Sequence, residues 1–489
     1  MRNSDGDDDD DDQERLREPV IVPRVRRPAD GLETALRLIR EHLNLPQSFP
    51  AEAELEARRA VEDLELPRDD ETRIPFVTID PEGATDLDQA VHLERSGDGY
   101  RVRYAIADVP AFVEPGGAID GEARQRGQTL YAPDGRVPLH PTLISEDAAS
   151  LLPGQLRGAY VWTFDLDDAA NVTALDLRRA RIRSREQLSY VQVQAALDSG
   201  AADSNLQLLR EVGLKRIELE RARGGASLNR PDEEVVFENG RYELVRRSPL
   251  PVEEWNAQIS LMTGMQAARI MIGGGIGILR TMPAPFPNTL ARFRRQVAAL
   301  GCPWPKGQPY GEYLRGLDHD DPRGLASIHA AASLFRGAGY TAFHGAEPQH
   351  ATQAAVAAPY AHATAPLRRL VDRYVLVICE ALSNGREAPD WVREALPTLP
   401  KVMARSDGVA SRLEHAVFDA IEAALLSTRV GEVFDAVVIS QRKKGGGVIQ
   451  LTDPVVTANI EGIVEAGQTV RAELVTADIA TATTLFRVA

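Results

Sequence analysis

Residues 76–90 read FVTIDPEGATDLDQA, a strand-like run that leads directly into a group of acids. The β-branched and aromatic residues from Phe76 to Ile79 predict a buried strand. Asp80 closes this strand, and a loop containing proline and glycine leads to Asp86 and Asp88. If the loop folds back, the three carboxylates converge, and such a cluster is stable only when a cation neutralises it or the acids are protonated.

The lack of histidine and cysteine in residues 76–90 indicates which cation this cluster would bind. Oxygen ligands favour Mg²⁺ or Mn²⁺ over Zn²⁺. Magnesium held by carboxylates, water and a substrate phosphate is a common arrangement for phosphoryl transfer. For the motif alone, an acidic surface loop or a structural calcium site is the alternative.

A second informative stretch is residues 359–374, which read PYAHATAPLRRLVDRY. A proline that follows a threonine at the start of an apolar periodic run is typical of a helix N-terminus. The pattern therefore predicts a helix from Pro366 to Leu382 with Thr364 as its N-cap.

Two arginines would lie in the first turn of this predicted helix. Arg368 and Arg369 would oppose the helix dipole there, which costs stability unless an anion such as phosphate is bound. The alternative is that both arginines pair with acids of the same helix, Asp372 and Glu380.

Two loops are candidate nucleic-acid contacts. Tyr131 lies at the edge of the loop LYAPDGRVPLHP (residues 130–141), where an aromatic ring can stack on a base or pack at a domain edge. The basic, glycine-rich turn Arg442-Lys443-Lys444 is either a solvated hairpin tip or a phosphate-binding loop.

Composition excludes several classes of protein. The chain has 489 residues, 43% of them hydrophobic, which suits several folded domains. Its formal net charge is −16, but the run Asp7–Asp12 concentrates acid in a tail, so a local basic channel stays compatible with it. No apolar run is long enough to span a membrane and no secretory signal begins the chain, which predicts a cytoplasmic protein. Cys302 and Cys379 have no disulfide-framework or zinc spacing.

Changes of pattern along the chain predict an α+β fold in four parts. Residues 1–20 are predicted to be an acidic disordered tail, and residues 21–72 a helical segment, with a helix-turn-helix as one arrangement. Residues 73–429 mix strands with long helices, as in the apolar stretch 253–271. Residues 430–489 contain five short strands, which predicts a small β-barrel of the OB type.

Taken together and in this order, these stretches resemble the ribonuclease II/ribonuclease R (RNB) family of exoribonucleases. The resemblance runs from about Arg73 to the end of the chain. Its segments are IPFVTIDPEGATDLDQA, YRVRYAIADVPAFV, LYAPDGRVPLHPTLISEDAASLLPG, PVEEWNAQISLMTGMQAARIM and ATAPLRRLVD. It implies an RNB catalytic domain at residues 73–429 and an OB-fold RNA-binding barrel at 430–489. It also implies a monomer that removes nucleoside 5′-monophosphates hydrolytically, from 3′ to 5′, from single-stranded RNA at a magnesium site.

The resemblance also implies roles for individual residues. Asp80, Asp86 and Asp88 match three of the family's four aspartates and would hold Mg²⁺, or Mn²⁺, and orient the attacking water. Arg368 matches the arginine that grips the scissile phosphate, with Arg369 beside it as an RNA contact. Tyr131 matches the aromatic that stacks near the RNA 3′ end.

Three departures from the family pattern stand out. Gln89 occupies the place of the fourth aspartate, where its amide oxygen would be a fourth, uncharged metal ligand. No clean match exists between Arg412 and Ile421 for the acid that usually neighbours the arginine, and Glu414 and Asp419 are the candidates. The paired cold-shock barrels of the family do not fit within residues 1–72.

Three hypotheses of function follow. The first is a magnesium-dependent exoribonuclease, which the presence of Asp80, Asp86, Asp88 and Arg368 together favours. The second is a catalytically weak or silent RNA-binding protein of the same fold, because of Gln89. The third, a magnesium phosphohydrolase of small molecules, is disfavoured because such an enzyme does not need the barrel.

Overall fold

The structure is a computed structural model, and it describes residues 30–226, 232–238, 241–318, 321–346, 348–442, 445–454 and 456–489. The predicted acidic tail at residues 1–20 lies outside the described residues. Mixed sheet and helix content confirms the predicted α+β class.

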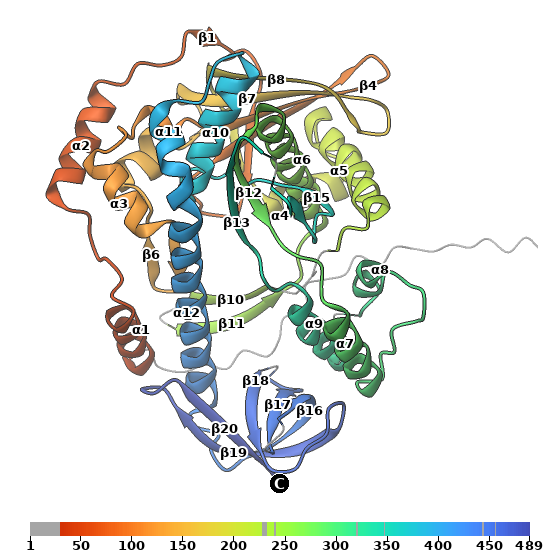
Figure 1. The fold of residues 1–489 in the computed structure, drawn as a ribbon. Helices are drawn as coiled ribbons and strands as arrows, with labels where there is room; N and C mark the ends of the chain where they lie inside the picture. The colour runs from red at the N-terminus through yellow and green to blue at the C-terminus, as the bar shows by residue number, and fades with distance from the viewer. Residues whose placement is uncertain are drawn as a thin grey trace, which may run out of the picture.

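A seven-stranded sheet forms the centre of the larger domain (Figure 1). Its order is β1–β8–β7–β4–β3–β2–β9, in which β1/β8 and β2/β9 pair in parallel and the other neighbours are antiparallel. The strands are β1 (Asp69–Asp70), β2 (Val77–Asp80), β3 (Gln89–Ser96), β4 (Gly99–Ala107), β7 (Arg157–Leu166), β8 (Val172–Ile182) and β9 (Glu186–Ser189). The predicted buried strand before Asp80 is thus β2, and all its residues except Asp80 are buried.

Helices cover the sheet and share one hydrophobic core with it. They are α4 (Tyr190–Asp198), α5 (Ser204–Arg223), α6 (Pro251–Gly274) and α10 (Leu370–Ser383). Helix α6, expected from residues 253–271, is buried along most of its length, because its residues are apolar on nearly every side. The Glu253 carboxylate accepts a hydrogen bond from the Leu250 N–H at 2.9 Å and so caps its first turn.

A closed five-stranded barrel forms the C-terminal domain and confirms the predicted OB-type fold. Its strands are β16 (Val433–Gln441), β17 (Gly447–Leu451), β18 (Thr457–Glu461), β19 (Thr469–Asp478) and β20 (Thr483–Val488). The long helix α12 (Leu399–Leu426) runs from the larger domain down to this barrel (Figure 1).

The two N-terminal helices pack on different elements. Helix α1 (Asp30–His42) lies against α12, whereas α2 (Ala51–Glu62) lies against α3 (Ala118–Arg126), well away from α1 (Figure 1). The remaining elements are β5 (Leu130–Ala132), β6 (Gly135–Val137), β10 (Asp232–Glu238), β11 (Arg241–Arg247), β12 (Ile276–Thr281), α7 (Pro287–Ala299), α8 (Tyr310–Arg315), α9 (Pro322–Ala331), β13 (Gly339–His344), β14 (Thr352–Gln353), β15 (Ala358–Pro359) and α11 (Asp390–Ala395).

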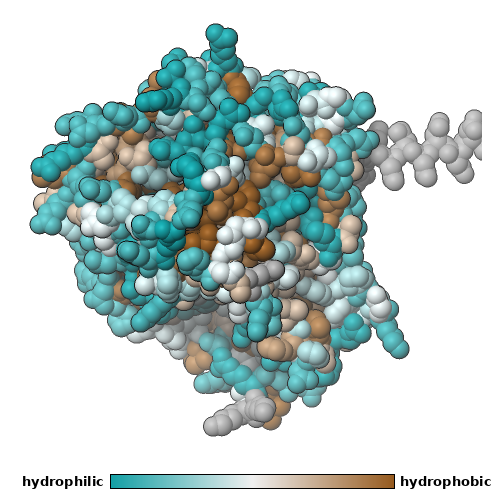
Figure 2. Space-filling model, turned by 45° about the horizontal axis from the view of Figure 1, so that its top comes forward, coloured by the Kyte–Doolittle hydropathy of each residue, from teal (hydrophilic) through white to brown (hydrophobic). Residues whose placement is uncertain are grey.

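One face of the molecule is mostly hydrophilic, with hydrophobic residues gathered near its centre (Figure 2).

Among the residues that the structure describes, no helix combines the length and apolar character that crossing a bilayer requires.

A glycine in α6 allows the chain at residues 360–364 to lie close to this helix. A Cβ at Gly264 would lie 2.2 Å from Cε2 of Tyr360 and 2.5 Å from the Ala361 carbonyl oxygen. The Ala361 N–H donates to the Gly264 carbonyl oxygen at 3.0 Å, so the contact is also a hydrogen bond. This close contact with α6 fixes the position of the segment that leads to Arg368.

We expect Gly264→Ala to lower the free energy of unfolding by about 1–3 kcal/mol, because the methyl group has no space and the backbone must shift. Chemical denaturation measures the effect. Gly273→Ala in the same helix is the matched control, because a Cβ there meets nothing within 4 Å. Equal stabilities of the two variants would contradict the close packing of residues 360 and 361 against Gly264.

Candidate active site

Two hydrogen bonds with Ser150 hold the acidic loop between β2 and β3. The Ser150 hydroxyl accepts from the Leu87 N–H at 3.0 Å and donates to the Thr85 carbonyl oxygen at 2.7 Å. The Asp88 carbonyl oxygen in turn accepts from the Ala107 N–H at 2.9 Å. The loop is therefore held on both sides of Asp86.

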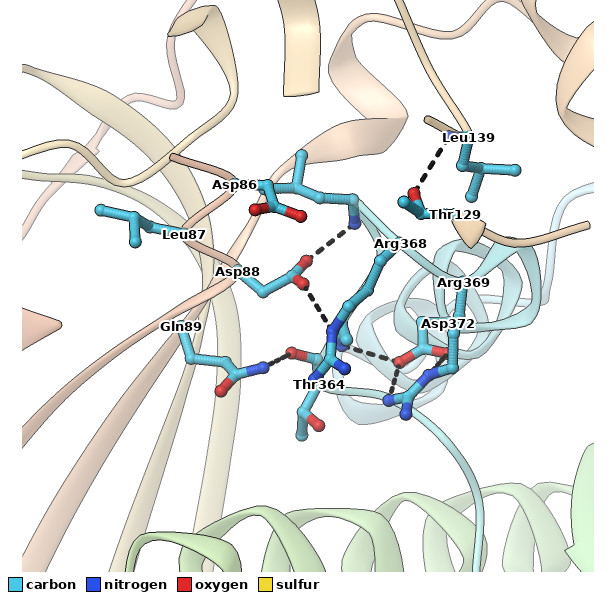
Figure 3. A network of polar contacts seen from close by, with 12 residues as sticks. Asp86, Leu87, Asp88, Gln89, Thr129, Leu139, Thr364, Arg368, Arg369 and Asp372 are labelled. Carbon is cyan, nitrogen blue, oxygen red and sulfur yellow. Dashed lines mark hydrogen bonds and ion pairs between the residues drawn. The ribbon is translucent and has the colours of Figure 1, made fainter. Parts of the chain in front are cut away.

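Asp88 is the buried centre of the site, with 2% of its surface exposed. Its carboxylate accepts from the Leu367 N–H at 2.8 Å and from Nε of Arg368 at 3.3 Å (Figure 3). Burial raises the pKa of Asp88 to about 8, although the charge of Arg368 opposes the rise. The predicted meeting of the acidic motif with the arginine motif is thus a direct contact.

Asp80 lies at the end of β2 with one oxygen unused. Its Oδ2 is buried and has no hydrogen-bond partner among the described residues. Burial raises the pKa of Asp80 to about 7, against the charge of Arg368 and helped by the charge of Asp86. A buried, unpartnered carboxylate oxygen beside a second acid fits a divalent cation as its missing partner.

Asp86 faces a β-hairpin formed by β5 and β6. The Tyr131 hydroxyl donates to its Oδ2 at 2.8 Å, and Nη1 of Arg136 donates to its Oδ1 at 2.9 Å. Arg136 also pairs with Glu146 at 2.6 Å. Tyr131 lies at the surface of the site, since 54% of the residue is exposed.

Arg136 is a site residue that the sequence analysis missed. Tyr131 and Arg136 are directly opposite each other in the β5/β6 pairing. Residues paired in this way lie on one face of a hairpin. Recognition of the turn Pro133-Asp-Gly135 as a hairpin turn would have placed Arg136 beside Tyr131.

The three acids do not come together as a complete metal cage. In the described parts of the chain, no group of three His, Cys, Asp or Glu side chains is close enough to hold one ion. The reason is visible in the contacts, because Asp86 faces Arg136 while Asp88 faces Leu367 and Arg368.

Gln89 hydrogen-bonds to neutral groups and not to the acids. Its Nε2 donates to the Thr364 carbonyl oxygen at 2.5 Å, and its Oε1 accepts from the Tyr104 hydroxyl at 3.1 Å (Figure 3). Tyr104 is further fixed by Ser260 at 2.8 Å. The amide thus joins β3 to the segment before Arg368, and the role of Gln89 as a metal ligand stays a prediction.

The helix after Arg368 begins later than predicted. Helix α10 starts at Leu370, with Arg369 as its N-cap residue in extended conformation. The cause is an antiparallel bridge between Gln128 and Arg369, in which the Leu370 N–H donates to the Gly127 carbonyl oxygen at 3.0 Å. Thr364 is therefore not the N-cap, and the two arginines precede the first turn.

The two arginines differ in their partners. Arg369 forms a two-point ion pair with Asp372, at 2.9 and 2.8 Å, and this pair raises the pKa of Arg369 despite its burial. This agrees with the alternative that Arg369 pairs with Asp372, whereas Glu380 pairs with Arg386. Arg368 contacts Asp88 through Nε, and 45% of its side chain is exposed.

The remaining candidate residues that the structure describes lie on the barrel and on helix α12. Arg442 donates to Oδ1 of Asn459 at 2.6 Å on the barrel, and Lys443 and Lys444 lie outside the described residues. Glu414 and Asp419, the candidate acids near the arginine, are both exposed on α12.

Asp407 of α12, which the sequence analysis did not single out, is linked to the arginine segment through Gln128, the bridge partner of Arg369. It accepts from Gln128 at 3.3 Å and from Arg280 at 2.9 Å. Asp108 is likewise paired, with Arg179, and its burial raises its pKa.

An α+β domain with buried carboxylates beside an arginine, followed by an OB-type barrel, defines a class of proteins that process nucleic acids. The RNB domain model matches residues 68–384, and the RNase II-type exonuclease C-terminal S1 domain matches residues 432–489. The chain belongs to the RNB family.

Curated relatives agree with this family. Ribonuclease R of Thermotoga maritima is 26% identical over an alignment of 433 positions, which covers 83% of this chain and 60% of the relative. Exoribonuclease 2 of Vibrio vulnificus is 33% identical over 162 residues, which are 33% of this chain and 24% of the relative. The chain thus spans less than two thirds of the length of these relatives.

Solved structures share the fold at low identity. Mycoplasma genitalium RNase R in complex with ribose methylated single-stranded RNA has a TM-score of 0.83 at 18% identity, over 94% of this chain and 78% of that one. Yeast Ssd1, described as a pseudonuclease, has a TM-score of 0.67 at 18% identity, over 90% of this chain and 57% of that one. The fold is therefore shared by proteins with and without nuclease activity.

We expect the contribution of Asp80 and Asp88 to the stability of the metal-free protein to fall as pH rises from about 4 to 8, because the folded state raises the pKa of both groups and therefore opposes their ionisation. Asp80→Asn should stabilise the protein by roughly 1–2 kcal/mol at pH 8 in chelator and flatten this slope. Thermal unfolding across pH, with chelator and with Mg²⁺, measures both. An Asp80→Asn variant with the wild-type slope would contradict the assigned burial cost.

Gln89→Glu tests the amide contact, because glutamate has the same length but no donor when ionised. We expect a loss of about 1–3 kcal/mol of stability at pH 8, since a carboxylate would face the Thr364 carbonyl oxygen. At pH 5 the loss should shrink, because a protonated carboxyl can donate. A stability loss that is the same at both pH values, or none, would show that the amide donor is not needed.

Proposed function

We propose that this chain is a metal-dependent exoribonuclease that shortens single-stranded RNA from its 3′ end and releases nucleoside 5′-monophosphates. The observation that carries the proposal is the contact of Arg368 with buried Asp88, in a site whose exposed edge presents Tyr131. Acids, a cation for phosphate and an aromatic for a base are thereby within one site.

Arg368 is the phosphate-binding group of the proposal. Its interaction with Asp88 uses Nε, and 45% of its side chain is exposed. A guanidinium fixed by a buried carboxylate can stabilise the charge that develops on a scissile phosphate. Arg369 is a weaker candidate for direct RNA contact, because Asp372 already occupies its Nε and Nη2 donors.

Tyr131 is the proposed stacking residue for the nucleotide at the 3′ end. Its hydroxyl is anchored on Asp86, while over half of the residue is open to solvent. An anchored aromatic ring offers a rigid face on which any base can stack.

Asp80, Asp86 and Asp88 would hold the metal together with water and a substrate phosphate, because the acids alone do not form a complete ligand set in the described residues. Mg²⁺ is the first choice of metal and Mn²⁺ the substitute. The buried, unpartnered Oδ2 of Asp80 and the raised pKa of Asp80 and Asp88 fit a cation at this place. When bound, the metal supplies activation of the attacking water and stabilisation of charge on the leaving oxygen. Gln89 stays a fourth, uncharged candidate ligand through its Oε1, which in the structure accepts from the Tyr104 hydroxyl.

The S1 barrel would bind RNA upstream of the site, as OB-type barrels commonly do. Arg442 on its first hairpin is a candidate phosphate contact, and Lys443 and Lys444 stay predictions. Action as a monomer in the cytoplasm also stays a prediction.

A specific observation favours one second candidate, an RNA-binding protein without activity. The amide of Gln89 cannot bring the charge of a fourth acid, and the described acids do not form a ready three-ligand set. The fold alone does not separate the two, since it is shared with a protein described as a pseudonuclease.

The decisive experiment follows a 5′-labelled single-stranded oligoribonucleotide over time, with Mg²⁺, Mn²⁺ or chelator. We expect a metal-dependent ladder that shrinks from the 3′ end. Asp88→Asn should abolish the ladder, by at least about a hundredfold in rate, because it removes charge at the centre of the site. RNA binding by this variant should change little.

Two results would decide against the exoribonuclease. RNA that is bound but never shortened by the wild type would establish the RNA-binding alternative. A ladder of wild-type speed from Asp88→Asn would show that the cleavage comes from a contaminant or another site. A matched DNA oligonucleotide tests the preference for RNA.

A further inference from the structure

Helix α1 packs against the back of the hairpin that carries Tyr131. Its Leu32 and Leu36 are buried in one hydrophobic cluster with Leu130 of β5 and Val137 of β6. Leucine and valine residues of α12, Leu413 and Val417 among them, complete this cluster. The hairpin therefore lies between a helical support on one side and the acidic loop on the other.

Strand alternation explains how one hairpin serves both sides. Leu130 pairs with Val137, and the next pair is Tyr131 with Arg136. Successive residues of a strand point to opposite faces. The first pair is buried against α1 and α12, and the second pair holds Asp86 at 2.8 and 2.9 Å.

A polar contact joins α1 to the tip of the same hairpin. Nη2 of Arg40 donates to Oδ1 of Asp134 at 2.5 Å and to the Gly135 carbonyl oxygen at 3.3 Å. About a quarter of each charged side chain is exposed, at 23% for Arg40 and 27% for Asp134. The ion pair is therefore partly shielded from solvent and spans the turn between β5 and β6.

A hairpin of this size needs such support. It has two short strands that pair only with each other, and a two-stranded hairpin alone is marginally stable in water. The places of Tyr131 and Arg136 thus depend on what packs against the opposite face.

The other end of α1 is also anchored. Ile479 and Ala482, in the turn between β19 and β20 of the barrel, pack against the same hydrophobic cluster. Helix α1 consequently lies between the C-terminal barrel and the β5/β6 hairpin, and it packs beside α12.

We propose that α1 is a positioning element of the active site, and that Arg40, acting through Asp134 and Gly135, sets the hairpin so that Tyr131 and Arg136 meet Asp86. Arg40 is a positioning residue, because it contacts the turn of the hairpin and not the acids themselves. The consequence for RNA rests on the proposed function, whereas the placement of the hairpin does not.

The test compares Arg40→Ala and Asp134→Ala with Arg37→Ala in the full chain. Arg37 is the matched control, because it lies on the same helix and, within the described part of the chain, its ion pair is with exposed Glu41 at 2.7 Å. Hydrogen exchange of residues 130–137 reads the hairpin without any need for activity. We expect exchange there to rise about tenfold in Arg40→Ala and Asp134→Ala, with no further rise in the double variant, and no change in Arg37→Ala.

Steady-state shortening of a short oligoribonucleotide reads the consequence. We expect the KM of Arg40→Ala to rise about fivefold with kcat changed less than twofold, because the ring that binds the terminal nucleotide is displaced. Arg40→Lys, which keeps a charge near Asp134, should recover most of both effects.

The outcomes separate the positioning role from the proposed function. Unchanged exchange at residues 130–137 in Arg40→Ala would overturn the positioning role, and so would an equal change in Arg37→Ala. Raised exchange together with a wild type that shortens no RNA would uphold the positioning role while the exoribonuclease fails. A fall in kcat with no change in KM would also overturn the stated effect on the terminal nucleotide.

Discussion

The contact of the Asp88 carboxylate with the Leu367 N–H and the Arg368 guanidinium is the constraint on which the site depends. It joins residues separated by 279 positions in the chain, and it is buried. A buried carboxylate is costly unless its oxygens receive donors, and here a backbone N–H and a cation supply them. The end of the sheet and the segment before α10 therefore cannot move apart without leaving buried polar groups without partners.

The irregular segment before α10 has its backbone satisfied by other elements. The Ala365 N–H donates to Asp372 at 2.7 Å, and the Arg368 carbonyl oxygen accepts from the Thr129 N–H at 2.9 Å. Gly264 of α6 supplies a further acceptor, for Ala361. Each buried peptide group of a non-helical segment needs a partner, and these partners fix the direction in which Arg368 points.

The parts predicted well from the sequence are those set by local patterns. The apolar run before Asp80, the apolar helix at 253–271 and the short strands after residue 430 each carry their own periodicity, and the structure has β2, α6 and the barrel at these places. The start of α10 could not be predicted in this way, because the bridge from Gln128 to Arg369 joins distant residues. Local pattern alone placed the helix start at Pro366.

The site shows the same division between local and distant information. Asp80, Asp86, Asp88 and Arg368 were expected together and lie in one region, although their roles in catalysis and metal binding stay predictions. The role of Gln89 was not predictable, because its partners Tyr104 and Thr364 come from another strand and from a distant loop.

The placement of Gln89 changes the electrostatic argument about activity. A fourth carboxylate next to Asp88 would add repulsion to a site in which burial already opposes ionisation of Asp80 and Asp88. The neutral amide of Gln89 adds no repulsion, and Arg136 balances the charge of Asp86. The protein therefore needs less positive charge from a metal to keep this site folded. The same features lower the attraction of the site for a cation, since fewer charges face it. Under the proposed function, a phosphate of bound RNA would bring negative charge and oxygen ligands to the same place, so metal and RNA would each increase the affinity for the other.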